Sequence, residues 1–382
     1  MTARTYLDWN ATAPLRPEAR EAMLRAMEAV GNPSSVHAEG RAAKKIVEDA
    51  RRDVAALVGC EPQEIVFTSG ATEAAALGFA YRPPTETCPG EPHTVIAAGI
   101  EHDCVAAYAN ASVTLPVLPS GRVSPFANPA ENAVFEFTHG GHTLTLQAAN
   151  SETGVLQDVA AFASELRDFD PTETVLISDM VQSLGKIPVT FRDAGIDFAL
   201  VSAHKFGGPK GIGALIVRNG IDLAAVLRGG GQEMGRRSGT ENVIGAAGFG
   251  AAAAVAHRLL LEGAWQAVAV LRDRLEARLA RIAPELIVFG KDAPRLPNTS
   301  CFAVPGWRGE TQVIQMDLAG FAISAGSACS SGKVKASRVL MAMGFDEETA
   351  GSAIRVSLGP TTMEAEVMAF ADAWEAAYTR RR

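Results

Sequence analysis

Short apolar runs alternate with helical stretches along the first two thirds of the chain. Runs of four or five residues rich in Val, Ile, Leu and Phe are typical of buried strands. They occur at 64–67, 94–98, 113–117, 133–137, 144–148, 174–178, 198–202 and 213–217. Helical patterns lie between several of these runs or before them, as at 17–30, 40–58 and from residue 71 onward. This alternation predicts an α/β fold with a mostly parallel sheet and helices on both of its faces.

The last third of the chain has a different pattern. We expect a long amphipathic helix at 264–282, strands at 287–289, 300–304 and 354–357, and a final helix at 362–378. A chain of 382 residues exceeds what one hydrophobic core usually supports, so we expect two domains. We place the large domain at 15–260 and assemble the smaller one from 1–14 and 261–382.

Composition and charge narrow the classes of partner. The formal net charge is −8, and a negative surface argues against nucleic acid or an anionic membrane as the main partner. The most apolar stretch, 243–256, is rich in Ala and Gly and is too short to cross a bilayer. The first residues do not have the pattern of a signal peptide. We therefore expect a protein of the cytoplasm.

The chain has five cysteines. An odd number without CxxC spacing fits neither a disulfide framework nor a zinc site, so we expect reduced thiols and no metal centre. The five are Cys60, Cys88, Cys104, Cys301 and Cys329.

A lysine and an aspartate each follow a predicted buried strand. Lys205 comes directly after the 198–202 run, and Asp179 comes directly after the 174–178 run. A lysine can hold the aldehyde of pyridoxal 5'-phosphate (PLP) as a Schiff base, and an aspartate can keep the ring nitrogen protonated. His204 could supply the positive charge that keeps the amine of Lys205 neutral. Taken alone, Lys205 could be an ordinary loop lysine and Asp179 an ordinary helix cap.

Three further features suit the same cofactor. Gln182 lies three residues after Asp179, where its amide could donate to the phenolic oxygen of the ring. The segment 68–73 joins a strand to a helix, and its N–H groups and hydroxyls suit a phosphate. His102, after the 94–98 strand, has a flat ring that could stack on the cofactor and move protons. The plain alternatives for the last two are a helix cap and a structural histidine.

Cys329 has a different setting from the other cysteines. It lies in a run of small residues, 324–332, which predicts a flexible loop that can carry a thiol to a substrate. Lys333, Lys335 and Arg338 follow, and nearby positive charge favours the thiolate. We interpret Cys329 as a nucleophile and assign the other four cysteines no role. A solvated surface thiol is the alternative.

Six ordered segments carry a resemblance to one family. They are 6–12 (Tyr-Leu-Asp-Trp-Asn-Ala-Thr), 31–37 (Gly-Asn-Pro-Ser-Ser-Val-His), 69–73 (Ser-Gly-Ala-Thr-Glu), 202–205 (Ser-Ala-His-Lys), 237–242 (Arg-Ser-Gly-Thr-Glu-Asn) and 327–329 (Ser-Ala-Cys). Together they resemble the NifS/IscS-type cysteine desulfurases of the class-V-aminotransferase-like PLP enzymes. The resemblance spans nearly the whole chain. It implies fold type I, with a mostly parallel seven-stranded sheet in the large domain and a smaller α+β domain.

The same resemblance implies PLP as the cofactor and three catalytic residues. Lys205 would form the Schiff base, His102 would stack on the ring, and Cys329 would accept the sulfur. The other cofactor-binding residues that it implies are Asp179 and Gln182 at the ring, and Ala71, Thr72, Ser202, His204 and Thr240 at the phosphate. Thr240 would reach the cofactor of the neighbouring subunit, which implies a homodimer.

The implied reaction converts L-cysteine to L-alanine. Cys329 would carry the sulfur as a persulfide to an iron–sulfur scaffold or another sulfur-acceptor protein, and Arg355 would bind the substrate carboxylate. One departure affects substrate binding, because the family usually has two asparagines before Glu-x-Gly. Here Ser151 occupies the position of the asparagine that contacts cofactor and substrate, so that contact could be lost, mediated by water or taken over by Asn150.

Other functions stay open. A selenocysteine lyase or an aminotransferase could use the same scaffold, although an aminotransferase needs no loop thiol. A binding module could keep the fold without the reaction, but a complete catalytic set argues against it. The sulfur acceptor and the pathway do not follow from the sequence.

Overall fold

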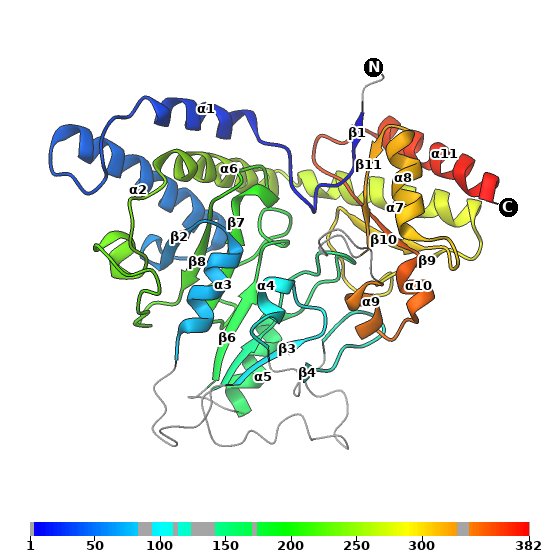
Figure 1. Ribbon diagram of the computed structural model, residues 1–382, viewed down its shortest axis with the longest axis horizontal. Helices are drawn as coiled ribbons and strands as arrows, with labels where there is room; N and C mark the ends of the chain where they lie inside the picture. The colour runs from blue at the N-terminus through cyan, green and yellow to red at the C-terminus, as the bar shows by residue number, and fades with distance from the viewer. Residues whose placement is uncertain are drawn as a thin grey trace.

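The computed structural model describes residues 4–82, 94–109, 114–123, 142–169, 174–326 and 336–381. The predicted strand at 133–137 and the segment around Cys329 lie outside these residues. A large sheet with its helices occupies one half of the molecule, and smaller sheets with the C-terminal helices occupy the other (Figure 1).

Seven strands form the large sheet, in the order β2-β8-β7-β6-β5-β3-β4. β8 pairs antiparallel with both of its neighbours, and every other pair in the sheet is parallel. The predicted mostly parallel seven-stranded sheet is confirmed, although β5 begins two residues before the expected start. The strands are β2 (Ile65–Thr68), β3 (Thr94–Ala98), β4 (Thr114–Leu115), β5 (His142–Thr145), β6 (Thr174–Asp179), β7 (Phe198–Ser202) and β8 (Gly213–Val217).

Both faces of this sheet are buried, because successive side chains of a strand point to opposite faces. On β7, Ala199 and Val201 pack into one core, and Phe198 and Leu200 pack into another. The first core also contains residues of α1 (Pro17–Met27), α2 (Ala38–Val58), α5 (Val159–Phe169) and α6 (Val243–Leu261). The second contains residues of α3 (Ala71–Ala80) and α4 (Asp103–Ala106).

Helix α6 corrects one inference from the sequence. With 19 residues and a mean hydropathy of 1.5, it is long and apolar enough to cross a membrane by length and composition. The argument that this stretch is too short is therefore wrong. The helix packs against α1 and α2 (Figure 1), and Phe249, Ala252 and Ala256 are fully buried. Packing in the core accounts for its apolar composition.

The other half of the molecule is built on a four-stranded antiparallel sheet and a two-stranded parallel one. The larger sheet has the order β12-β13-β10-β9, and β1 pairs with β11. The strands are β1 (Thr5–Tyr6), β9 (Ile287–Val288), β10 (Thr299–Ala303), β11 (Phe321–Ala322), β12 (Ser324–Ala325) and β13 (Ala353–Ser357). The helices are α7 (Ala264–Ile282), α8 (Gly309–Leu318), α9 (Arg338–Ala342), α10 (Glu347–Gly351) and α11 (Glu364–Arg381).

Helices α7, α8 and α11 share a third core with strands of the small sheets, whereas Leu340 of α9 and Ala350 of α10 pack into the first core of the large sheet. Trp374 and Phe370 of α11 are fully buried in the third core, together with Leu7 from the N-terminal segment. Leu7 of the N-terminal segment thus packs with the C-terminal part of the chain, and the division into 15–260 and 1–14 plus 261–382 stays a prediction. Three 3₁₀ turns complete the described fold: η1 (Pro62–Glu64), η3 (Ala203–Lys205) and η4 (Gln232–Gly235).

Candidate active site

A cavity of about 610 Å³ lies where the parallel strands of the large sheet end. In α/β proteins, ligands bind at this carboxyl edge, because several loops converge there. The segments that follow β2, β3, β5, β6 and β7 all contribute to the lining. The predicted site residues that line it are Ala71, Thr72, His102, Ser151, Asp179, Gln182, Ser202, His204, Lys205 and Arg355.

Lys205 is delivered to the cavity by β7 and the turn η3. Its Nζ donates to the carbonyl oxygens of Asn10 at 2.8 Å and Ala11 at 3.0 Å. The N-terminal segment therefore forms the wall against which the lysine rests. An amine held at the edge of the cavity is in place to bond to an aldehyde inside it.

His204 does not have the charge that the sequence suggested. Burial, followed by the positive charges of Lys205 and Lys210, lowers the pKa of His204 to about 4. Its Nδ1 lies 3.1 Å from the hydroxyl of Thr12. His204 is thus neutral at neutral pH, and the expectation that it supplies positive charge beside Lys205 is wrong.

Asp179 and Gln182 form another part of the wall. Asp179 ends β6 and is 9% exposed; its Oδ1 accepts a hydrogen bond from Val181 N at 2.9 Å. Burial raises the pKa of Asp179, whereas the charges of His102 and Lys205 act in the opposite direction. A protonated ring nitrogen would add a positive charge and favour the carboxylate further. Gln182 donates from Nε2 to the carbonyl oxygen of Asn10 at 3.0 Å.

The phosphate side of the cavity is the start of helix α3. No side chain among the described residues caps this helix, so its first N–H groups are available to a ligand. Glu73 shapes the loop before it: its carboxylate accepts from Ser69 N at 2.7 Å and from Arg237 Nε at 2.8 Å. An uncapped helix start, a buried carboxylate and an amine around one cavity fit the phosphate, ring nitrogen and aldehyde of PLP.

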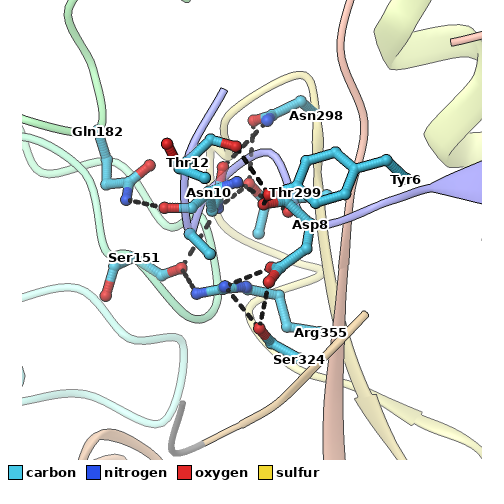
Figure 2. Close-up of polar contacts among 12 residues, drawn as sticks. Tyr6, Asp8, Asn10, Thr12, Ser151, Gln182, Asn298, Thr299, Ser324 and Arg355 are labelled. Atoms are coloured by element: carbon cyan, nitrogen blue, oxygen red, sulfur yellow. Dashed lines mark hydrogen bonds and ion pairs between the residues drawn. The ribbon is translucent and has the colours of Figure 1, made fainter. Parts of the chain in front are cut away.

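Arg355 belongs to β13 and lines the cavity, and Figure 2 shows it beside Asp8, Ser151 and Ser324. It is 3% exposed, and its Nη2 donates to Asp8 Oδ1 at 2.8 Å and to Ser324 Oγ at 3.1 Å. Its Nη1 donates to the carbonyl oxygen of Ser151 at 2.9 Å. The Nε–H has no hydrogen-bond partner among the described residues. A buried guanidinium with an unused donor suits an incoming carboxylate.

Asn150 and Ser151, the two residues where the family usually has asparagines, differ in their position relative to the cavity. Ser151 lines the cavity, and its carbonyl oxygen helps to hold Arg355. Asn150 is 1% exposed and does not line the cavity. Its Oδ1 accepts from the backbone N–H groups of Glu152 and Thr153, and its Nδ2 donates to Ile100 O at 3.2 Å. This placement corrects the suggestion that Asn150 replaces the missing contact, because its amide is committed to the local turn.

Two more predicted site residues are not in the lining of this cavity. The structure describes Thr240 at another place and does not describe Cys329. Thr240 is exposed and lines a separate cavity of about 180 Å³, which shares Ser69 and Gly211 with the larger one. Cys329 lies outside the described residues, as does Cys88.

Sequence reasoning gave Cys104 no role, yet it lines the cavity. Its Sγ lies 3.1 Å from His102 Nδ1, and the same nitrogen accepts from Cys104 N at 3.2 Å. When the His102 ring carries a single proton, this contact places that proton on Nε2. Cys60 and Cys301 are different, because burial raises the pKa of both thiols, that of Cys60 to about 12.

Glu101 is a second residue that the sequence did not single out. Its Oε1 accepts from Gln147 N at 2.7 Å, and its Oε2 has no hydrogen-bond partner among the described residues. Burial, then the charge of Asp179, raises the pKa of Glu101 to about 8. A carboxylic acid that is mostly uncharged at neutral pH thus lies close to the Asp179 carboxylate. Its position directly before His102 was the one available signal.

Known proteins share this fold and this sequence pattern along almost the whole chain. The family model described as aminotransferase class-V matches residues 5–370. A cysteine desulfurase of Cereibacter sphaeroides is 40% identical, covering 95% of this chain and 93% of that protein. An IscS-like cysteine desulfurase of Mycobacterium tuberculosis is 34% identical, with coverage of 99% and 97%. The structure of a NifS-like protein from Rickettsia africae superimposes with a TM-score of 0.86 at 31% identity, covering 98% and 99% of the two chains.

The chain belongs to the class-V aminotransferase family, whose members combine this sheet with a PLP site at its carboxyl edge. Within that family it belongs with the NifS/IscS-type cysteine desulfurases, and it is a PLP-dependent enzyme. The cofactor predicted from Lys205 and Asp179 is therefore confirmed. The roles of the individual residues stay predictions.

Proposed function

We propose that the protein converts L-cysteine to L-alanine and transfers the sulfur to Cys329 as a persulfide. The observation that carries this proposal is the convergence of Lys205, Asp179 and Arg355 on one cavity. They are an amine for the aldehyde, a carboxylate for the ring nitrogen and a guanidinium for the substrate carboxylate. The similarity to cysteine desulfurases supports cysteine as the substrate.

Each residue of the cavity has its own proposed role in the reaction. Bound here, PLP supplies a ring that withdraws electrons from the α-carbon of the substrate. Arg355 holds the substrate carboxylate, and Lys205 Nζ takes the α-proton. Asp179 keeps a negative charge opposite the ring nitrogen. His102 would stack on the ring and take part in proton transfer; its Nδ1 contacts Cys104.

The sulfur transfer is assigned to Cys329. Its thiolate bonds to the sulfur of the substrate while the Cβ–S bond breaks, and the electron pair of that bond stays with the carbon skeleton. Protonation of that skeleton gives alanine. Cys329 keeps the sulfur as a persulfide, which a thiolate of an acceptor protein removes by attack on the outer sulfur. An iron–sulfur scaffold or another sulfur-acceptor protein is the proposed partner, and the cytoplasm the proposed location.

A homodimer with shared active sites is part of the proposal. Thr240 is exposed and lies outside the cavity of its own subunit, which supports a contact with the neighbouring subunit. Three large apolar side chains on the segment that leads to it are also about half exposed: Val226, Leu227 and Met234. A neighbouring subunit would remove them from water.

Replacing Cys329 with Ser tests the assigned nucleophile. Cys329→Ser should abolish alanine formation from L-cysteine and leave the visible absorption of the bound cofactor unchanged, because Cys329 is assigned to sulfur transfer and other residues are assigned to hold the cofactor. Cys60→Ser is the matched control, because Cys60 does not line the cavity and burial holds its thiol protonated. Alanine formation by Cys329→Ser at the rate of the unmodified protein would overturn the assignment and favour a lyase that releases the sulfur without a protein-bound persulfide.

A further inference from the structure

Lys186 is a buried lysine that the proposed reaction does not use. It follows β6 by a short turn, is 2% exposed and is among the largest fully buried side chains of the described residues. Lysines are rarely buried unless they are paired, because removing the ammonium from water is costly. Within the described part of the chain, Lys186 forms no ion pair, and both of its side-chain partners are neutral amides. We therefore ask which residues this buried lysine positions.

The two partners of Lys186 are both at the cofactor cavity. Nζ donates to Gln182 Oε1 at 2.6 Å and to Asn10 Oδ1 at 2.9 Å. Since lysine offers N–H donors to these contacts, the oxygen of each amide must face Nζ and the nitrogen must face away. Gln182 Nε2 is thereby turned toward the carbonyl oxygen of Asn10, and its second N–H is left for the cavity that Gln182 lines.

Asn10, one of the two partners of Lys186, also connects the N-terminal segment to the start of β10. Asn10 Nδ2 donates to Thr299 Oγ1 at 2.9 Å, and its Oδ1 also accepts from Asn298 Nδ2 at 3.0 Å (Figure 2). The carbonyl oxygen of Asn10 accepts from Lys205 as well as from Gln182. Lys186 therefore orients Gln182, the proposed hydrogen-bond donor to the cofactor ring, and holds Asn10, which accepts a hydrogen bond from Lys205.

We propose that Lys186 is a positioning residue of the cofactor site, which fixes the Gln182 amide so that its N–H group faces the ring oxygen of PLP. Burial, followed by the charges of Lys205 and Arg355, lowers the pKa of Lys186 well below its ordinary value. Donation to two amide oxygens does not require a full charge, so this environment is compatible with the role. The inference rests on the cofactor and is independent of the sulfur transfer.

The test is a double-mutant cycle read without substrate. The variants are Lys186→Met, Gln182→Met and the double variant, and the readout is the pH titration of the visible band of the bound cofactor. A hydrogen-bond donor to the ring oxygen stabilises the deprotonated form of the cofactor bound to Lys205, and it therefore lowers the pKa at which the visible band titrates. Removing the donor should therefore raise the titration midpoint, by about 0.5–1 pKa unit. Lys186→Met should give this shift alone and no further shift when Gln182 is already Met.

A control and a second variant keep the test decisive. Lys45→Met removes an exposed lysine of α2, which pairs with Asp49, and should leave the midpoint unchanged. Lys186→Gln, whose shorter side chain reaches less far, takes the place of Lys186→Met in the cycle if the methionine variant does not fold. A folded variant without a shift contradicts the proposal. So does a shift that persists in the Gln182→Met background, because that result assigns Lys186 a general electrostatic effect. Absence of the visible band from the unmodified protein would contradict the cofactor assignment instead.

Discussion

Single residues at the cavity differ in how their charge is controlled. Burial keeps His204 neutral and Glu101 mostly protonated, whereas Arg355 is buried with Asp8 as its ion-pair partner. Desolvation disfavours the charged form unless a partner of opposite sign compensates. Burial without an ion-pair partner among the described residues thus leaves His204 neutral and Glu101 mostly protonated, whereas Asp8 compensates the charge of Arg355.

The stability of the apoprotein should report the neutral state of His204. Its ordinary pKa is 6.5, and in the folded chain it is lowered to about 4. Above pH 6.5, His204 is unprotonated in both the folded and the unfolded chain. As the pH falls from 6.5 toward about 4, His204 binds a proton in the unfolded chain but not in the folded chain, so the free energy of unfolding decreases. Denaturant unfolding at about pH 7 and about pH 4.5 should show a larger loss for the unmodified protein than for His204→Asn. Equal losses would contradict a buried neutral His204.

At the scale of elements, the start of α3 is held by an ion pair from a distant segment. Burial tends to raise the pKa of Glu73, but hydrogen bonds from Arg237 and Ser69 outweigh it and the net pKa is lowered. Glu73 is therefore a carboxylate that joins the loop before α3 to the segment preceding α6. The proposed phosphate site depends on that junction.

Replacing Glu73 with Gln should weaken cofactor binding. The loss of charge weakens the hydrogen bonds from Arg237 and from Ser69 N, so the loop before α3 is held less firmly in the shape that suits a phosphate. We expect the Kd for PLP to rise about tenfold, which corresponds to about 1.4 kcal/mol. Fluorescence titration of the apoprotein with PLP measures it. Glu39→Gln, at an exposed first-turn position of α2, is the control. An unchanged Kd for Glu73→Gln would mean that the loop needs no such support.

The elements show which parts of the site the sequence could predict. Asp179 and Lys205 were found because each follows a run of buried apolar residues, and strand ends are where α/β sheets place their ligands. Asn10, Lys186 and Cys104 were not found. Their roles depend on contacts between distant segments, such as Asn10 with Thr299, which no local period reveals. The strands β1, β11 and β12 were missed because two residues are too short to show alternation, whereas the equally short β4 and β9 lie in the longer runs 113–117 and 287–289.

At the scale of the whole molecule, the site lies between the large sheet and the N-terminal segment that packs with the C-terminal elements. Asp8 and Asn10 come from the first residues of the chain, whereas Arg355 comes from near its end (Figure 2). The site is therefore complete only when both halves of the molecule are folded together. Thr240 extends this dependence to a second subunit in the proposed dimer.

Hybrid dimers test whether Thr240 acts across subunits. One subunit would carry Lys205→Ala and the other Thr240→Ala. If Thr240 reaches the neighbour, the subunit that retains Lys205 also receives an intact Thr240 and should bind PLP with the affinity of the unmodified protein. If Thr240 acts within its own subunit, that site should bind as weakly as the Thr240→Ala homodimer. Isolation of doubly tagged hybrids and titration with PLP distinguish the two results, and the second would contradict the shared site.

The central claim is that this cavity desulfurates L-cysteine with PLP. The most direct test is the visible absorbance of the purified protein before and after addition of L-cysteine, with alanine and sulfide assayed in the same sample. We predict a cofactor band near ~400 nm that changes on addition of cysteine, together with alanine and sulfur in equal amounts. A band without alanine would contradict cysteine as the substrate, and Ser151 would be the first position to restore to Asn. The absence of a band after reconstitution with PLP would contradict the assignment of Lys205 itself.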